Sequence, residues 1–382
     1  MINRLLNLIK PLTSLKLTIT GLSGLFIVIL WGTFVQLKLG IFYTQKLYFQ
    51  SFFIFHTFPN GFKIPIFFGG VVFGGLLTIN LIAVLLIRIK WRLKNSGLIL
   101  IHLGLLGLLI GSFLTGKLAK ESQLIFSEGE SKTHSISRQT PELVVSLPHY
   151  DIAPTTTESQ WIFPFQSLKQ GQRLRIPQLF DIRINAFYRN SRLRRNPSIN
   201  TALNGLARHF DIVPIPIDQS PEGANTVSLV VSIISEGKEL GRWGLSQGFD
   251  SDQVIMVNGR PLYITLRDQR RYMPYTLSLI DFSHDVYPGT TVPKNFSSLV
   301  QLTNPDTGED REVLIYMNHP LRYEGRTYFQ ASFGENDTLS VLQVVENPAW
   351  LFPYLSTLMI TAGLIFQFMM MLIRFIRKKQ HD

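Results

Sequence analysis

The chain has 382 residues, 46% of them hydrophobic, and a formal net charge of +11. No Asp or Glu precedes Glu121, whereas residues 117–349 carry 23 Lys and Arg against 25 Asp and Glu. The excess positive charge therefore flanks apolar segments, which is typical of membrane proteins and gives no reason to expect nucleic-acid binding. The absence of cysteine excludes disulfides, thiol chemistry and thiolate-ligated metals.

Four apolar runs are long enough to cross a bilayer, which takes about 20 residues of helix. They cover residues 15–35, 65–87, 97–115 and 350–373. The first run is longer than a signal-peptide core and lacks a small-residue cleavage site after it, so we interpret it as an anchor. Residues 36–64, rich in aromatic side chains, are expected to form a short helix at the membrane interface.

These runs divide the chain into three parts. Residues 1–116 are predicted to hold three transmembrane helices, residues 117–349 an external domain, and residues 350–382 the last helix with a basic tail. The positive-inside rule places the basic loop and the tail in the cytoplasm and the large domain on the other side of a bacterial plasma membrane. The residues that decide this orientation are Arg88, Lys90, Arg92, Lys94, Arg374, Arg377, Lys378 and Lys379.

Residues 117–349 have the periodicity of β-strands. Short runs rich in branched and aromatic residues alternate with turn signals such as Asn258-Gly259 and Asp306-Thr307-Gly308. Helical spacing is scarce. The sequence therefore predicts a large all-β, antiparallel, sandwich-like domain that could divide into two lobes.

His102 is the one titratable residue of the third apolar run. An ionisable group inside a membrane helix is costly, which favours a functional role. The alternative is a neutral histidine that is hydrogen-bonded to a neighbouring helix, for example to Asn80. At about 100° per residue, Gly104, Gly107 and Gly111 share one narrow face, which favours close helix packing, and His102 points nearly opposite.

Weaker candidates for binding lie in two other stretches. His56 belongs to the aromatic segment, where an ordinary interfacial histidine is the simpler interpretation. Residues 317–325, MNHPLRYEG, are predicted to form the turn between two strands, with His319, Arg322 and Tyr323 near its tip. We expect this hairpin, with Arg326 also at its tip, to dock on the membrane or on a partner protein.

The stretch from Asp281 to Phe333, together with VVENPAW before the last apolar run, resembles the carboxyl-terminal half of the ResB/CcsB family. The three amino-terminal spans and the loop containing FIFHTF agree with that architecture. Proteins of this family are the B component of System II cytochrome c biogenesis. The tryptophan-rich loop of their partner is absent, so the sequence resembles the B component alone.

The resemblance implies that haem b is carried across the membrane and attached to apocytochrome c together with a CcsA/ResC-type protein. A thiol-reducing, thioredoxin-like protein is a further implied partner. The family's membrane histidine, an axial ligand of haem iron, corresponds to His102 by position and type. The chain would then be non-catalytic or half of a haem lyase. The alternative function is a scaffold that binds no haem and holds apocytochrome or assembly partners.

Overall fold

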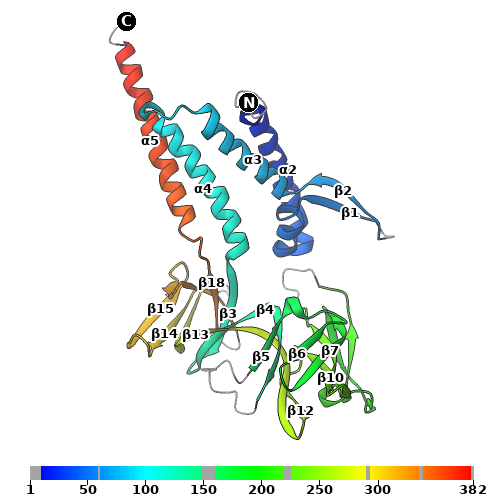
Figure 1. Ribbon diagram of the computed structural model, residues 1–382. Helices are drawn as coiled ribbons and strands as arrows, with labels where there is room; N and C mark the ends of the chain where they lie inside the picture. The colour runs from blue at the N-terminus through cyan, green and yellow to red at the C-terminus, as the bar shows by residue number, and fades with distance from the viewer. Residues whose placement is uncertain are drawn as a thin grey trace. The chain divides into compact units, whose positions relative to one another are not determined.

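A computed structural model describes residues 10–58, 61–147, 160–218, 225–289, 293–334 and 339–379 (Figure 1). These residues form two compact units. Residues 10–119 and 347–379 form the helical unit, and residues 120–218 and 225–346 form the β unit.

The helical unit contains four helices that are long and apolar enough to cross a membrane. With the large antiparallel domain described below, they confirm the predicted fold class. The stretches that could span run over Leu15–Ile41, Gly70–Arg88, Leu93–Leu118 and Phe352–Arg377. The helices are α2 (Leu15–Thr44), α3 (Gly70–Ala83), α4 (Ser96–Leu118) and α5 (Phe352–Lys379), with short turns η1 (Lys10–Thr13), η2 (Gln45–Phe49), η3 (Val84–Arg88) and η4 (Leu93–Asn95).

The aromatic segment, residues 36–64, is helical only in its first part. α2 is broken at Gly40, whose φ of 72° and ψ of 167° are not helical, and a short helical stretch follows it through η2 to Phe49. The prediction of a short helix is wrong for the rest of the segment. After α2 and η2, the chain forms an antiparallel hairpin of β1 (Phe53–Thr57) and β2 (Lys63–Phe68). As a result α3 begins at Gly70, five residues after the predicted start of the second span. The sequence between the strands, Pro-Asn-Gly, separates two runs of branched and aromatic residues, and that combination favours a hairpin.

The β unit consists of antiparallel strands and two short helical turns, η5 (Phe165–Ser167) and η6 (Gly205–Arg208). The strands are β3 (Lys120–Ser127), β4 (Ser131–Ser146), β5 (Gln160–Pro164), β6 (Arg173–Ile176), β7 (Phe180–Tyr188), β8 (Ser191–Arg195), β9 (Phe210–Pro214), β10 (Ser228–Ser235), β11 (Lys238–Ser246), β12 (Gln253–Val257), β13 (Arg260–Val286), β14 (Pro293–Asn304), β15 (Glu309–Tyr316), β16 (Leu321–Tyr323), β17 (Arg326–Gly334) and β18 (Leu339–Glu346).

Two hydrophobic cores divide the β unit into two lobes, as the sequence suggested. In the first lobe the sheet β11-β10-β7-β6 packs against strands β12, β13, β4 and β5. In the second lobe the sheet follows the order β15-β14-β13-β4-β3-β18-β17-β16. Ile315 of β15 and Leu321 of β16, at opposite ends of that order, share one core, so this sheet curls round on itself.

Strand β13, 27 residues long, belongs to both lobes and uses a different face in each. Successive side chains of a strand point to opposite faces. The even-numbered Leu262, Ile264 and Leu266 enter the first core, whereas the odd-numbered Met273, Tyr275 and Leu277 enter the second. The residues between, 267–272, form the waist of the β unit and belong to neither core.

Candidate functional site

The His102 side chain is oriented by its own helix. Its Nδ1 lies 2.8 Å from the carbonyl oxygen of Leu98, one turn earlier in α4. A carbonyl can only accept, so this contact requires the hydrogen on Nδ1. In the neutral ring Nε2 then keeps its lone pair, and no hydrogen-bond partner for Nε2 occurs among the residues that the structure describes. Such an arrangement, with one ring nitrogen bonded to a carbonyl and the other available, is typical of metal-ligating histidines.

The glycine face of α4 packs against α5, as the sequence predicted for a small-residue face. Gly97, Gly104 and Gly111 are buried and recur every seven residues. A Cβ at Gly104 would lie 2.8 Å from the carbonyl oxygen of Ser356, and one at Gly97 would lie 2.8 Å from the carbonyl oxygen of Gly363. The two backbones therefore approach so closely that only glycine fits.

His102 lies on the other side of α4, about 200° around the helix from Gly104. Its neighbours along that face include Leu98 and Leu105, which are 38% and 39% exposed. An imidazole with a free nitrogen on an exposed apolar surface fits a ligand of haem iron, because the flat porphyrin ring needs apolar contacts beside its axial ligand.

The alternative role for His102, a hydrogen bond to Asn80, is not supported. The Asn80 Oδ1 accepts from the Thr18 hydroxyl at 2.8 Å, and its Nδ2 donates to the Leu12 carbonyl at 2.6 Å. Asn80 therefore links α3 to the start of α2 through these hydrogen bonds. It has no role in orienting His102.

Among the residues that the structure describes, His102 does not belong to a cluster of metal-binding side chains. Within the described residues, no group of three or more His, Asp or Glu side chains is placed to hold a metal ion. His56 is exposed in β1, with its ring edge-on to Phe58 at 4.7 Å.

The predicted hairpin tip at residues 317–325 is divided by an extra strand. Asn318, with φ 64°, turns the chain after β15, and His319 stacks on Tyr316 at 4.2 Å. The short strand β16 follows and pairs with β17 through a turn at Glu324 and Gly325. The prediction of a single hairpin between β15 and β17 was therefore wrong.

Tyr323 and Arg326 do not form an exposed tip. The Tyr323 hydroxyl accepts a hydrogen bond from Asn304 at 2.8 Å, and its ring packs edge-on against the buried Tyr275 at 4.8 Å. Arg326 forms an ion pair with Glu346 at 2.9 Å, and its side chain is 16% exposed. Both side chains hold the second lobe together, and of the predicted contact residues His319 and Arg322 are the exposed ones.

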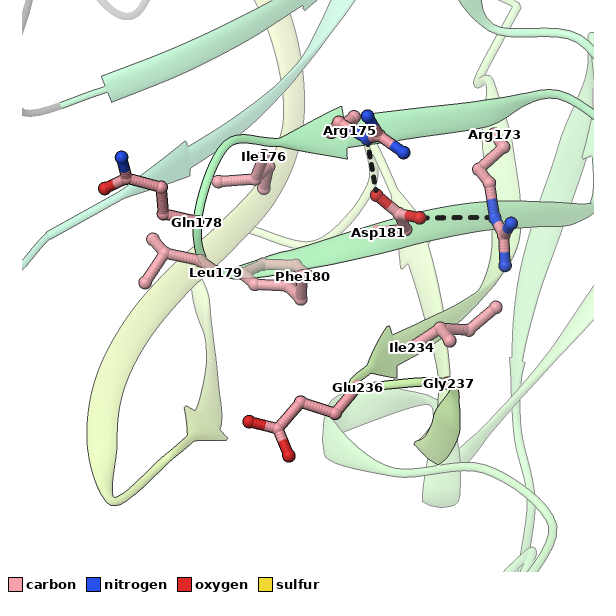
Figure 2. A pocket seen from close by; sticks show the side chains of 10 residues that line it. All are labelled: Arg173, Arg175, Ile176, Gln178, Leu179, Phe180, Asp181, Ile234, Glu236 and Gly237. Atoms are coloured by element: carbon pink, nitrogen blue, oxygen red, sulfur yellow. Dashed lines mark ion pairs between the residues drawn. The ribbon is translucent and has the colours of Figure 1, made fainter.

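A shallow cavity of about 390 Å³ lies at the ends of β6, β7 and β10. Figure 2 shows Asp181 between Arg173 and Arg175, at 3.4 Å and 3.6 Å from their Nε atoms. Because the carboxylate already neutralises part of this charge and the arginines are largely exposed, the cavity has no arrangement suited to a specific ligand.

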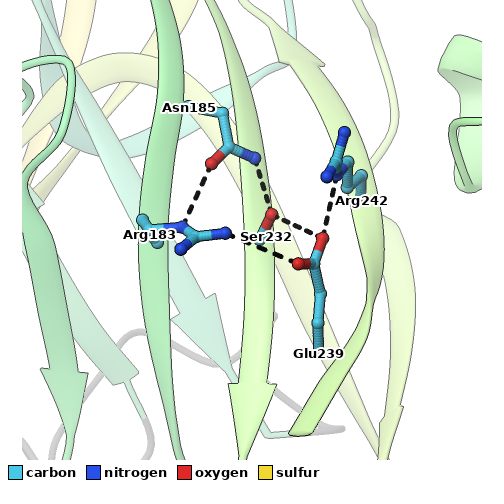
Figure 3. A network of polar contacts seen from close by, with 5 residues as sticks. All are labelled: Arg183, Asn185, Ser232, Glu239 and Arg242. Carbon is cyan, nitrogen blue, oxygen red and sulfur yellow. Dashed lines mark hydrogen bonds and ion pairs between the residues drawn. The ribbon is translucent and has the colours of Figure 1, made fainter.

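A polar network covers the outer face of the small sheet in the first lobe. Figure 3 shows Glu239 receiving contacts from Arg183, Ser232 and Arg242, with Asn185 bridging Arg183 and Ser232. The hydrogen bonds from Arg242 and Ser232 lower the pKa of Glu239. The five side chains hydrogen-bond to one another across β7, β10 and β11, so we interpret this network as structural.

His134, in β4 beside Tyr272, makes the β unit sensitive to acid. Burial, together with the charges of Arg270, Lys132 and Arg267, lowers the pKa of His134 to about 4. The unfolded chain, with an ordinary histidine pKa, binds this proton more readily, so the contribution of His134 to stability is lost as pH falls from about 6.5 to 4.

We expect His134→Gln, which is neutral throughout, to unfold with a flatter pH dependence than the wild type over that interval. Thermal unfolding of the two purified chains from pH 4 to 7 measures it, and parallel profiles would contradict the prediction. Burial raises the pKa of Glu142, so protonation of this carboxylate favours the folded state as pH falls. This effect opposes that of His134, but it is present in both chains and cancels in the comparison.

Comparison with known proteins agrees with the sequence resemblance. Residues 241–347, which include all of β12 to β18, match the model of the ResB-like family. The chain is also 26% identical over 297 residues to Protein NrfI of Wolinella succinogenes; this alignment covers 76% of the chain and 29% of that protein. The chain thus spans less than a third of the length of this relative. The family match confirms the resemblance to ResB proteins that the sequence suggested.

Proposed function

We propose that this protein is a membrane subunit of a System II cytochrome c biogenesis complex that carries haem across the membrane. His102 supplies one axial ligand through Nε2, and a CcsA/ResC-type partner supplies the other. The partnership then joins haem to apocytochrome c. The observation that carries the proposal is the hydrogen bond from His102 to the Leu98 carbonyl, which leaves Nε2 available on a surface outside the α4–α5 contact.

Haem is the cargo, and the residues of this chain bind and orient it. The Leu98 carbonyl holds the imidazole in one tautomer, and the apolar side chains beside His102 exclude water from the ring face. With one ligand from each protein, haem would be held only while the partners are together. If the two proteins moved apart, the iron would lose one of its axial ligands, and the haem could pass to its acceptor.

The orientation of the chain is part of this proposal. The basic loop at residues 88–94 and the basic end of α5 favour the cytoplasmic side, which places His102 near the side where haem is made. Reporters inserted after Lys94 and after Gly308, in the β14–β15 turn, should report opposite compartments. The same compartment for both would exclude the orientation.

The proposal as a whole is tested by purifying the tagged chain from membranes under mild detergent. We expect a second polytopic membrane protein and haem to be recovered with it, with the absorption spectrum of a low-spin, six-coordinate haem. Recovery of the partner without haem would favour the alternative function, a scaffold that holds apocytochrome or assembly partners.

A further inference from the structure

A cavity of about 260 Å³ lies between α2 and the β1–β2 hairpin, within the helical unit. α2 contributes Ile27 and Trp31 to its lining, η2 contributes Tyr48, and both hairpin strands contribute apolar side chains that include Ile66. Apolar cavities of about 150 Å³ stay dry and bind small hydrocarbons, whereas pockets for drug-sized molecules measure about 300–1,000 Å³. The volume therefore suits one hydrocarbon chain and is small for a ring system such as a porphyrin.

The cavity exists because the chain doubles back after α2. The helix is broken at Gly40, and the stretch that follows returns along α2. The ring of Phe49 marks this return, since a Cβ on Gly32 would lie 3.0 Å from it. The hairpin then begins beside Val28, which shares a small hydrophobic core with Ile54 of β1. The hairpin thus covers α2 near Val28 and encloses the space between them.

The length of α3 indicates how deep this level lies in a membrane. The start of α3 is also close to Val28, because Phe73 belongs to the same small core. The stretch of α3 and η3 that could span a membrane, Gly70–Arg88, has 19 residues. At about 1.5 Å per residue it is about 28 Å long, close to the hydrocarbon thickness of about 30 Å. One surface of the membrane is therefore expected near Gly70, at the level of the hairpin.

The polar groups of the cavity lie at its end nearer to that surface. Trp31 is one helical turn beyond Ile27, in the direction away from the start of α2. Tyr48 reaches the same end, because the adjacent Phe49 packs at Gly32. Tryptophan and tyrosine are enriched where a membrane meets water, since each combines an apolar ring with a polar group. The cavity thus has an apolar end toward the hydrocarbon and a polar end toward the surface.

This setting selects a lipid as the occupant. Ile27 and Trp31 belong to the stretch of α2 that could span a membrane, and they are 44% and 54% exposed, so the rim of the cavity faces the bilayer. A void forfeits the dispersion contacts of its lining, and an acyl chain that fills it restores them. Among the described residues neither the Trp31 N–H nor the Tyr48 hydroxyl forms a hydrogen bond, so both can donate to a lipid oxygen.

We propose that this cavity holds one acyl chain of a membrane phospholipid, whose ester or phosphate oxygens accept hydrogen bonds from Trp31 and Tyr48. The bound lipid fills the space between α2 and the hairpin and keeps the hairpin against the helix at the membrane surface. The proposal does not depend on haem binding at His102 or on which side of the membrane is cytoplasmic.

The test counts lipids bound to the full chain, purified in detergent and washed until loosely held lipid is removed. Native mass spectrometry with added dioleoyl phosphatidylglycerol should show one tightly bound lipid per chain. An excess of decylubiquinone, an apolar chain with a quinone ring in place of the phospholipid headgroup, should leave that lipid bound. Absence of a tightly bound lipid, or its displacement by the quinone, would overturn the proposal.

Ile66→Trp places a larger side chain in the cavity and should abolish tight binding of the lipid. Ile66 is 50% exposed, so the change leaves the small core intact. Ile64→Trp is the matched control, because it makes the same change in the same strand at an exposed position outside the cavity lining, and it should keep the lipid. Equal lipid binding by the two variants would place the lipid elsewhere on the chain and contradict the proposal.

A second variant, Trp31→Phe with Tyr48→Phe, keeps aromatic side chains at both positions and removes the two hydrogen-bond donors. It should bind the same lipid about tenfold more weakly, as expected for the loss of two neutral hydrogen bonds. Its unfolding temperature without lipid should equal that of the wild type, since neither donor has a partner in the chain. Wild-type affinity for the lipid in this variant would show that Trp31 and Tyr48 do not hold the headgroup.

Discussion

A strain whose only copy carries His102→Ala is expected to produce no mature cytochrome c, although the protein itself accumulates normally. Alanine is a strong helix former and removes a polar group from an apolar helix, so α4 should be unaffected. The iron would lose the Nε2 ligand that the Leu98 hydrogen bond leaves available. Haem staining of the cell's proteins after electrophoretic separation measures the yield.

The matched control for this prediction is His56→Ala. His56 is exposed in the β1–β2 hairpin and belongs to the same helical unit. We expect near-normal maturation with it. If both variants behave like the wild type, His102 is a packing residue; if His56→Ala alone stops maturation, the ligand has been assigned to the wrong histidine.

Gly104→Val is expected to separate α4 from α5. Even a Cβ at Gly104 would lie 2.6 Å from the Ile360 side chain and 2.8 Å from the Ser356 carbonyl oxygen, and backbone atoms cannot move aside without shifting the helix. Overpacking of this kind costs about 1–3 kcal/mol, and the branched valine adds to it. The expected result is a lower unfolding temperature in detergent and faster proteolysis of the α5 segment.

Gly116→Val is the control for the packing of α4 against α5. It makes the same change in the same helix, at a position where an added Cβ meets nothing within 4 Å. Any loss of helix propensity is therefore comparable, and only the contact with α5 differs. Equal unfolding temperatures for Gly104→Val and Gly116→Val would show that the glycine face does not hold the two helices together.

Much of the architecture follows from local patterns. Apolar length predicts the four helices, the spacing of Gly104 and Gly111 predicts a close-packed face, and alternation with turn signals predicts the antiparallel domain. These features depend on residues close together in the chain. The sequence suggested two lobes but did not show where the boundary between them lies, because that boundary depends on which face of β13 each core uses.

The errors came from features that depend on distant residues. The aromatic segment suggested an interfacial helix because its side chains are apolar, but the partner strand β2 made an extended pairing available. Tyr323 was expected at the tip of a hairpin. Its hydroxyl instead accepts a hydrogen bond from Asn304 at the end of β14, two strands earlier in the chain. Such contacts follow from strand order, which a single sequence does not contain.

The site was predictable in part. His102 is identified as a candidate by its position in an apolar run. The face of the helix on which it lies follows from Gly104, Gly107 and Gly111, which share the opposite face.

The most direct measurement is the absorption spectrum of the purified complex from three samples: wild type, His102→Ala, and His102→Ala prepared with imidazole. Haem ligation by His102 predicts a low-spin spectrum in the first, loss of haem in the second, and recovery of haem and spectrum in the third, since free imidazole can occupy the vacated position. Wild-type haem content and spectrum in His102→Ala without imidazole would contradict the assignment of His102 as an axial ligand.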